Sequence, residues 1–158
     1  MTIRTGFGYD VHAFAEGRAL WLGGVLIDHP AGLLGHSDAD VLIHAICDAL
    51  LGAANMRDIG FHFPDSSAIY KDVDSKLLLQ KTITLLREAG YELGNIDSTI
   101  VAETPKLSPY IPAMQQALAR VLSVDEDLIS IKATTTERLG FTGRSEGIAA
   151  CASVLIHR

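Results

Sequence analysis

The protein has 158 residues, a length that suits one domain with a core of its own. Hydrophobic residues make up 48% of the chain and charged residues 20%, and no apolar run is long enough for a membrane helix. The net charge of −6 argues against nucleic acid as a partner, because no basic stripe could contact phosphates. We expect one domain over residues 1–158 with no nucleic-acid or membrane partner, located in the cytoplasm, or in the plastid stroma if the chain is a trimmed mature form.

The first half of the chain alternates between strand and helix patterns. Residues 3–12 resemble a strand with two glycines, and residues 20–27 resemble two short apolar strands joined at a glycine pair, which predicts a β-hairpin. Apolar residues at helical spacing predict a helix over 39–54, with Ser37 or Asp38 as its cap.

The middle of the chain begins with a loop and returns to regular structure. Residues 55–73 carry glycine, proline and aspartate and are typical of a loop. A helix is predicted over 75–89, capped by Asp74 and ended by Gly90. Residues 96–103 alternate in polarity as a strand does.

The last third of the chain completes the expected fold. A helix begins at Ser108-Pro109 and runs to about Leu122, and residues 129–134 alternate as a strand. Residues 138–146 form a glycine-rich turn, whereas the small apolar residues of 147–156 fit helix and strand equally. We expect an α+β fold: a mixed four-stranded sheet covered by helices, with a short hairpin. Cys47 and Cys151 lie in apolar runs, so two buried free thiols are expected.

The first candidate site combines Asp10, His12 and His44. Residues i and i+2 of a strand project from one face, so Asp10 and His12 point together. Two histidines and one carboxylate leave a fourth position open, as in catalytic zinc sites. Asp40 and Asp48 lie one helical turn either side of His44 and could orient its ring. On spacing alone, a surface hydrogen bond between Asp10 and His12, a core histidine at 44 and solvated aspartates are the more ordinary interpretation.

Two further clusters could contact phosphate. Residues 36–40 stand at a helix start, where free N–H groups attract anions, although a plain N-cap explains them equally well. Residues 132–144 combine hydroxyls, two arginines and Glu137, which could meet a magnesium ion held mainly by substrate phosphates. A strand end followed by a solvated turn is the alternative there.

Two loops are weaker candidates. Residues 58–65 hold aromatic and acidic side chains and could form a mobile substrate loop or a packed surface loop. Residues 102–107 follow a strand and include Lys106, an ordinary surface position for a lone lysine.

Taken in order, these pieces resemble the 2-C-methyl-D-erythritol 2,4-cyclodiphosphate synthase family from about Gly6 to Ile156. The most specific matches are Gly8-Tyr9-Asp10-Val11-His12, residues 32–40 with His44, Asp58-Ile59-Gly60 with Phe63-Pro64-Asp65, and Lys132 through Gly147. Gly35, Ala39 and Ser145 stand where we expect Ala, Gly and Gly in this family.

The resemblance implies a homotrimer with active sites at subunit interfaces. In such enzymes the 2-phosphate of 4-diphosphocytidyl-2-C-methyl-D-erythritol 2-phosphate attacks the β-phosphorus, and CMP leaves. By position, Asp10, His12 and His44 would hold Zn²⁺, and Glu137 would meet Mg²⁺ or Mn²⁺. His36 and Thr135 would act on the transferring phosphate.

The resemblance also implies the substrate contacts. The erythritol phosphate side would meet Asp58, Gly60, Phe63, Pro64, Asp65, Ser66 and Ser67. Further substrate contacts would come from Asp10, His12, His36, Ser37 and Ile59. The cytidine diphosphate would meet, largely from a neighbouring subunit, Ala102, Glu103, Thr104, Pro105, Lys106, Leu107, Ser108, Thr134, Thr135, Thr136 and Glu137. Phe141 and Arg144 would line a cavity on the threefold axis that can hold an isoprenoid diphosphate. A zinc phosphohydrolase, or a non-catalytic trimer that binds isoprenoid diphosphates, are the alternatives.

Overall fold

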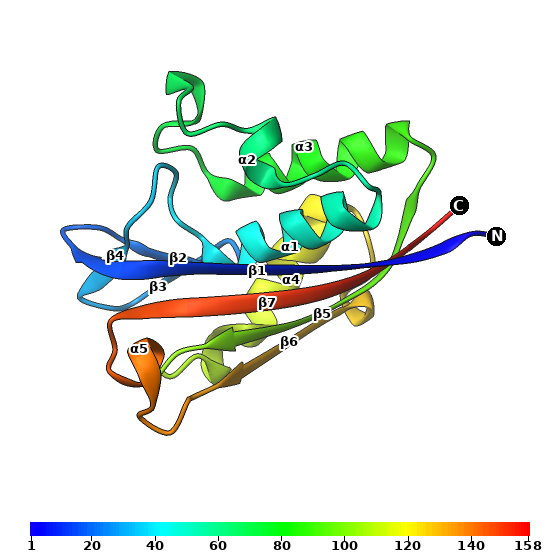
Figure 1. Ribbon diagram of the computed structural model, residues 1–158. Helices are drawn as coiled ribbons and strands as arrows, with labels where there is room; N and C mark the ends of the chain where they lie inside the picture. Colours follow the sequence, from blue (N-terminus) through cyan, green and yellow to red (C-terminus); the bar gives the residue numbers. More distant parts are fainter.

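The computed structural model describes residues 1–158 and has an α+β architecture. Its sheet has the strand order β4-β1-β7-β5-β6, in which only the β5–β6 pair is parallel. Figure 1 shows α1 lying along β1 and β7, with α3 beyond α1 and the two termini side by side. The strands are β1 (Ile3–Glu16), β2 (Leu20–Leu22), β3 (Val25–Ile27), β4 (Ala31–Leu33), β5 (Glu92–Val101), β6 (Ile129–Thr134) and β7 (Gly147–His157).

Short helical turns accompany the three long helices. No helix is long and apolar enough to cross a membrane. The α-helices are α1 (Val41–Ala53), α2 (Ile59–His62), α3 (Ser75–Glu88), α4 (Ile111–Leu122) and α5 (Gly140–Gly143), and the 3₁₀ turns are η1 (Ala68–Tyr70), η2 (Ser108–Tyr110) and η3 (Glu126–Leu128).

The sheet has five strands, so the prediction of four was wrong. The additional strand is β4, which pairs with Phe14–Glu16 at the end of β1. A strand of three residues carries no detectable alternation, and β1 itself runs four residues past the expected 3–12. The β2–β3 hairpin is confirmed as a separate two-stranded sheet.

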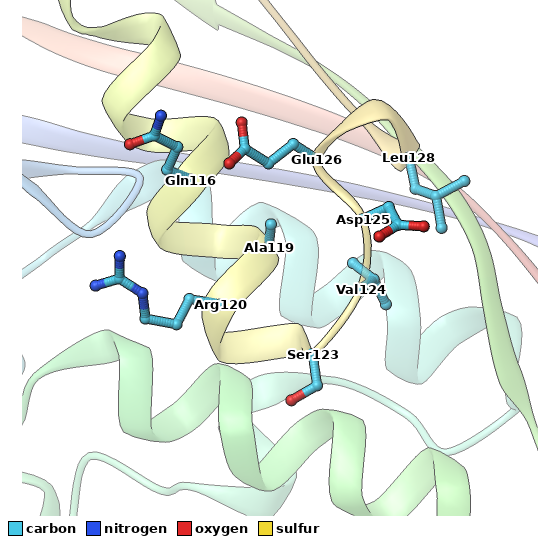
Figure 2. Close-up of a pocket in the computed structure, with 8 residues that line it drawn as sticks. All are labelled: Gln116, Ala119, Arg120, Ser123, Val124, Asp125, Glu126 and Leu128. Atoms are coloured by element: carbon cyan, nitrogen blue, oxygen red, sulfur yellow. The ribbon is translucent and has the colours of Figure 1, made fainter.

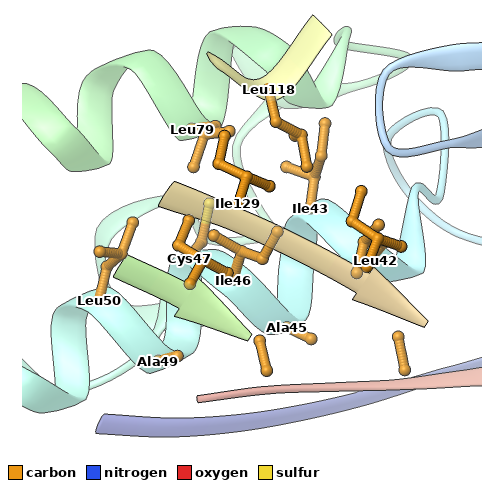
Figure 3. Packing of buried hydrophobic residues seen from close by; sticks show 14 of the residues in the cluster. Leu42, Ile43, Ala45, Ile46, Cys47, Ala49, Leu50, Leu79, Leu118 and Ile129 are labelled. Carbon is orange, nitrogen blue, oxygen red and sulfur yellow. The ribbon is translucent and has the colours of Figure 1, made fainter. Parts of the chain in front are cut away.

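Helix α1 forms the centre of the core. Figure 3 shows its Leu42, Ile43, Ile46 and Leu50 among residues of α3, α4 and β6. All four are fully buried, and each contributes about 1.5–3 kcal/mol by leaving water. Cys47 is also fully buried, and burial raises the pKa of its thiol to about 12.

Other expectations from the sequence need adjustment. Helix α1 is capped by Asp40 rather than by Ser37 or Asp38, because the chain turns at Ala39 and the helix starts only at Val41. Both cysteines are free as expected, but Cys151 is only half-buried.

The loop and the third long helix also differ in detail. The 55–73 loop contains the short turns α2 and η1. A 3₁₀ turn at Ser108–Tyr110 precedes α4, which replaces the single helix expected from Ser108.

Candidate metal centre and substrate hollows

Strand β1 and helix α1 bring Asp10, His12 and His44 together. His12 Nε2 lies 3.0 Å from Asp10 Oδ2, and His44 Nδ1 lies 3.0 Å from the same oxygen. The two ring nitrogens are 3.2 Å apart. The three ligand atoms therefore form a nearly equilateral triangle at the edge of the sheet–helix layer.

Glycines in β1 allow the helix to come this close. A Cβ on Gly8 would lie 2.0 Å from the carbonyl oxygen of Ala45, and one on Gly6 would lie 1.9 Å from that of Ala49. Because those atoms are helix backbone, only glycine permits α1 to sit directly on the strand. This contact places His44 over Asp10.

The triangle fits a tetrahedral metal ion. Zinc bonds of ~2.0–2.1 Å place neighbouring ligand atoms about 3.3–3.4 Å apart, close to the 3.0–3.2 Å separations of the three atoms. Each residue offers one ligand atom. The side chains are partly exposed to solvent, Asp10 by 26%, His12 by 18% and His44 by 12%. The fourth corner of the tetrahedron can therefore be reached from outside.

In each histidine, the ring nitrogen that faces away from the triangle has a hydrogen-bond partner, and that partner determines which nitrogen carries the hydrogen. His12 Nδ1 lies 2.7 Å from the carbonyl oxygen of Leu34, which can only accept, so Nδ1 carries the hydrogen and Nε2 presents a lone pair. His44 Nε2 faces the hydroxyls of Ser75 at 3.0 Å and Ser37 at 3.2 Å. Both histidines thus have a partner that orients the ring.

The two aspartates on either side of His44, Asp40 and Asp48, accept hydrogen bonds from backbone N–H groups. Asp40 is fully buried and accepts hydrogen bonds from the N–H groups of Gly23, Gly24 and Ile43. Asp48 accepts from the N–H of Ile59 at 2.7 Å. Of the two alternatives left open by the sequence, neither Asp40 nor Asp48 orients the ring by a hydrogen bond, and Asp40 is not solvated either, because backbone N–H groups lie nearer to both carboxylates.

The electrostatics of the cluster favour an ionised carboxylate. Burial, the largest influence on Asp10, would raise the pKa of its carboxyl, but hydrogen bonds and charge from His12 and His44 outweigh it and lower the pKa well below its usual range. Burial lowers the pKa of His12, and the hydrogen bond and charge of Asp10 outweigh that effect and raise it. Asp10 is thereby kept in the form that binds cations.

A hollow of about 250 Å³, here the cluster hollow, opens beside the triangle. It brings together residues from β1, α1 and the 58–70 loop, as the sequence motifs predict for a substrate site. Asp58, Pro64, Ser66 and Ser67 do not line it, although His36 Nε2 lies 3.2 Å from the carbonyl oxygen of Ser67. Its predicted lining residues are Asp10, His12, His36, Ser37, His44, Ile59, Gly60, Phe63 and Asp65.

Sequence reasoning missed several residues of this hollow. Leu34, Tyr70, Val73 and Leu78 line it, and Ser75 lies behind His44. Leu34 lies within the matched stretch 32–40, whereas the other four have no spacing or neighbour in the sequence that links them to a site. Residues 36–40 were a candidate phosphate site because they lead into a helix. The N–H group of Ile43 in the first turn of α1 is not free to bind a phosphate, because it donates to the Asp40 carboxylate.

A second hollow of about 410 Å³, here the β5–β6 hollow, lies where these parallel strands end. Glu103 contributes a carboxylate oxygen that is buried without a hydrogen-bond partner. Thr104 and Thr136 do not line this hollow. Its lining residues are Ala102, Glu103, Pro105, Lys106, Leu107, Ser108, Ala133, Thr134 and Thr135.

Glu137, Phe141 and Arg144 lie outside both hollows. Glu137 is exposed, and one of its carboxylate oxygens is 3.3 Å from the hydroxyl of Thr135. Arg144 pairs with Glu146 at 2.7 Å. A lone exposed carboxylate holds magnesium only together with other ligands, such as substrate phosphates.

The largest hollow, of about 670 Å³, lies beside the end of α4 and contains none of the predicted residues. Figure 2 shows Arg120, Asp125 and Glu126 on its rim, pointing in different directions. It holds no histidine or cysteine, and its two carboxylates point apart, so size alone does not identify the functional site.

Comparison with known proteins identifies the family to which the chain belongs. The model described as the YgbB family matches residues 3–157. The chain belongs to the YgbB family. A curated relative from Parabacteroides distasonis, named 2-C-methyl-D-erythritol 2,4-cyclodiphosphate synthase, is 72% identical over all of this chain and 98% of its own length.

Solved structures of similar proteins share the fold. The bifunctional IspDF from Campylobacter jejuni is 48% identical with a TM-score of 0.95, covering 98% of this chain but 42% of that longer chain. The CDP complex of IspF from Plasmodium falciparum is 36% identical with a TM-score of 0.85, covering 98% of this chain and 95% of that one. The family resemblance read from the motifs is thus confirmed over the whole chain.

Proposed function

We propose that this protein converts 4-diphosphocytidyl-2-C-methyl-D-erythritol 2-phosphate into 2-C-methyl-D-erythritol 2,4-cyclodiphosphate and CMP, as a phosphorus–oxygen lyase of non-mevalonate isoprenoid biosynthesis. The observation that carries the proposal is the triangle of Asp10, His12 and His44 beside the cluster hollow. The name shared by close relatives supports the same reaction.

The metal at the triangle is proposed to be Zn²⁺, one per subunit. Imidazole and carboxylate donors, with one corner open, suit catalytic zinc. A second ion, Mg²⁺ or Mn²⁺, would bind Glu137 together with the substrate diphosphate. Bound cations would neutralise the two phosphates and stabilise the charge that develops on CMP as it leaves.

The residues of the chain would act by positioning. Nucleophile and electrophile belong to one substrate molecule, so folding it correctly supplies much of the rate. His36 and Thr135 would hold the transferring phosphate, and the loop residues from Asp58 to Ser67 would hold the erythritol phosphate. No protein nucleophile is required, because the 2-phosphate of the substrate attacks the β-phosphorus.

The β5–β6 hollow is proposed to bind the cytidine diphosphate. Solved relatives are described as bound to CDP, which supports a cytidine nucleotide as ligand. The proposed contacts are residues 102–108 and 134–137. Backbone groups where strands end are suited to a flat base and a diphosphate.

A homotrimer would unite the two hollows. The cluster hollow and the β5–β6 hollow have no lining residue in common. Alternate residues of β1 present apolar side chains on the face away from α1, with exposed fractions of 66% for Phe7, 53% for Tyr9 and 42% for Val11. Such a face is typical of a subunit interface, and Phe141 and Arg144 would then line an axial cavity for an isoprenoid diphosphate.

Product analysis tests the proposal. Phosphorus NMR of a reaction with the cytidine substrate, zinc and magnesium should show cyclic diphosphate and CMP in equal amounts. A linear phosphate product would identify a zinc phosphohydrolase, with water in place of the 2-phosphate. Binding of isoprenoid diphosphate without any turnover would identify a non-catalytic trimer.

The single domain over residues 1–158 and the cytoplasmic location, or the plastid stroma for a trimmed form, belong to the same proposal. Expression of the chain alone tests the domain, which should fold and turn over without an added segment. Cell fractionation with an antibody tests the location.

A further inference from the structure

Behind His44 lies a chain of hydrogen bonds through Ser75 and Asp38, neither of which lines the cluster hollow or the β5–β6 hollow. His44 Nε2 is 3.0 Å from the hydroxyl oxygen of Ser75, a residue with no exposed surface. That hydroxyl is 2.5 Å from Asp38 Oδ1, and the Ser75 N–H donates to Asp38 Oδ2 at 2.9 Å. Asp38 therefore accepts hydrogen bonds from both the hydroxyl and the N–H group of Ser75, one at each carboxylate oxygen.

The direction of this chain is fixed by its end. An ionised carboxylate accepts hydrogen bonds and donates none, so the hydrogen of the Ser75 hydroxyl points to Asp38. A lone pair of the Ser75 oxygen then faces His44, and only an Nε2–H can complete that contact. His44 Nδ1 is left with its lone pair directed at Asp10 and His12.

The same residues connect the site to the 55–73 loop. The Asp38 N–H donates to the carbonyl oxygen of Val73 at 3.1 Å, and the Asp72 N–H donates to that of His36 at 2.8 Å. With the two Asp38–Ser75 bonds, these contacts fasten the end of the loop to the segment that leads into α1.

We propose that Asp38 and Ser75 form a positioning relay that holds His44 in the Nε2–H tautomer and keeps its Nδ1 ready to bind metal. This inference rests on the metal site of the proposed function and assigns to that site two positioning residues, neither of which touches the metal. Removing a residue that orients a metal-binding histidine typically costs about 10–100-fold in metal affinity.

Zinc affinity, measured by competition with a chromophoric chelator, tests the relay without reference to turnover. Ser75→Ala removes the nearer of the two hydroxyls that face His44 Nε2, the one whose hydrogen is held by Asp38, and we expect it to weaken zinc binding about 10–100-fold. Thr82→Val is the matched control, because Thr82 is also fully buried on α3 and its hydroxyl forms no hydrogen bond with Asp10, His12 or His44. Its zinc affinity should equal that of the wild type.

Asp38→Asn provides a second variant of nearly the same shape. An amide NH₂ that donates to Ser75 would reverse the hydroxyl and turn its hydrogen toward His44, which favours the wrong tautomer. We expect zinc affinity to fall as in Ser75→Ala. Nitrogen-15 NMR of the imidazoles, recorded without metal, should show the Nε2–H form of His44 in the wild type and its loss in Asp38→Asn.

The outcomes separate the relay from the proposed function. If the wild type binds no zinc at the triangle, the metal assignment of the proposed function is wrong. If the wild type binds zinc and both variants bind it equally well, with an unchanged tautomer, the relay is overturned.

Discussion

His44 links two hydrogen-bonded systems through its two ring nitrogens. One nitrogen faces Asp10 and His12, and the other faces the hydroxyls of Ser37 and Ser75. Its side chain is 12% exposed and makes polar rather than core contacts, so its role is to hold a ligand geometry more than to fill the core.

His44→Ala should therefore fold and trimerise but lose turnover by at least about a hundredfold, because one of three metal ligands is absent. Metal content, circular dichroism and the rate of CMP release measure the three properties. His29→Ala, which removes a histidine that contacts Ala31 elsewhere, should retain turnover. An unfolded His44→Ala protein would mean that the metal is structural, and full activity would remove His44 from the metal site.

Among individual residues, contacts within one strand could be predicted from the sequence, whereas a contact between two helices could not. Asp10 and His12 could be paired from sequence, since i and i+2 on a strand share a face. Ser75 could not be linked to His44, because 31 residues separate them and only the packing of α3 beside α1 brings the hydroxyl to the ring. The aspartates nearer in sequence, Asp40 and Asp48, could have oriented the ring on spacing alone, but they accept hydrogen bonds from backbone N–H groups.

At the scale of elements, the contact of β1 with α1 decides whether the site exists. Gly8→Ala would force a methyl group into the helix backbone at Ala45, 2.0 Å away, and backbone cannot give way as a side chain can. We expect a loss of about 3 kcal/mol in the free energy of unfolding, together with weaker zinc binding.

Urea denaturation measures this change. The control is Gly52→Ala, because Gly52 lies exposed within α1 and a Cβ there would meet nothing within 4 Å. Alanine favours helix, so the control should gain up to about 1 kcal/mol. Equal stability of Gly8→Ala and the wild type would contradict the packing account.

A second prediction concerns the turn after α5. Ser145 has a φ of 55°, in the left-handed region that costs residues other than glycine about 1 kcal/mol. Ser145→Gly should raise the free energy of unfolding by roughly 0.5–1 kcal/mol, measured as a higher midpoint in urea. Ser66→Gly, at an exposed serine without a positive φ, should give no gain. A destabilised Ser145→Gly would show that the turn is not strained.

Elements with a clear period were predicted and elements without one were not. Helix α3 begins at Ser75 and is capped by Asp74, as predicted from the sequence. This prediction was possible because the apolar residues of an amphipathic helix recur at helical spacing along the sequence. The small residues of 147–156 carry no period. They form β7, which pairs with β1 on one side and β5 on the other, and that choice depends on partners far away in sequence.

At the scale of the whole molecule, one chain offers two separate hollows. A complete active site in the proposed trimer takes the cluster hollow from one subunit and the β5–β6 hollow from its neighbour. Such an arrangement allows a subunit that lacks a zinc ligand to be complemented by a subunit that lacks a residue proposed to hold the cytidine diphosphate and its metal ion, such as Glu137.

Mixed trimers test this. His44→Ala and Glu137→Ala proteins should each be inactive, and equal amounts dissociated and reassembled together should recover about a quarter of wild-type activity, because each mixed trimer has one intact interface. Mixing without dissociation is the control and should recover nothing. No recovery after verified mixing would place both halves of the site within one subunit.

A crystal structure with zinc and a cytidine nucleotide, with anomalous scattering at the zinc edge to identify the metal, tests whether the active site combines two subunits around a zinc ion. The account predicts zinc on Asp10 Oδ2, His12 Nε2 and His44 Nδ1 of one subunit, facing a nucleotide held by residues 102–108 and 134–137 of its neighbour. Zinc bound elsewhere, or a nucleotide that lies away from the zinc of every subunit, would contradict it.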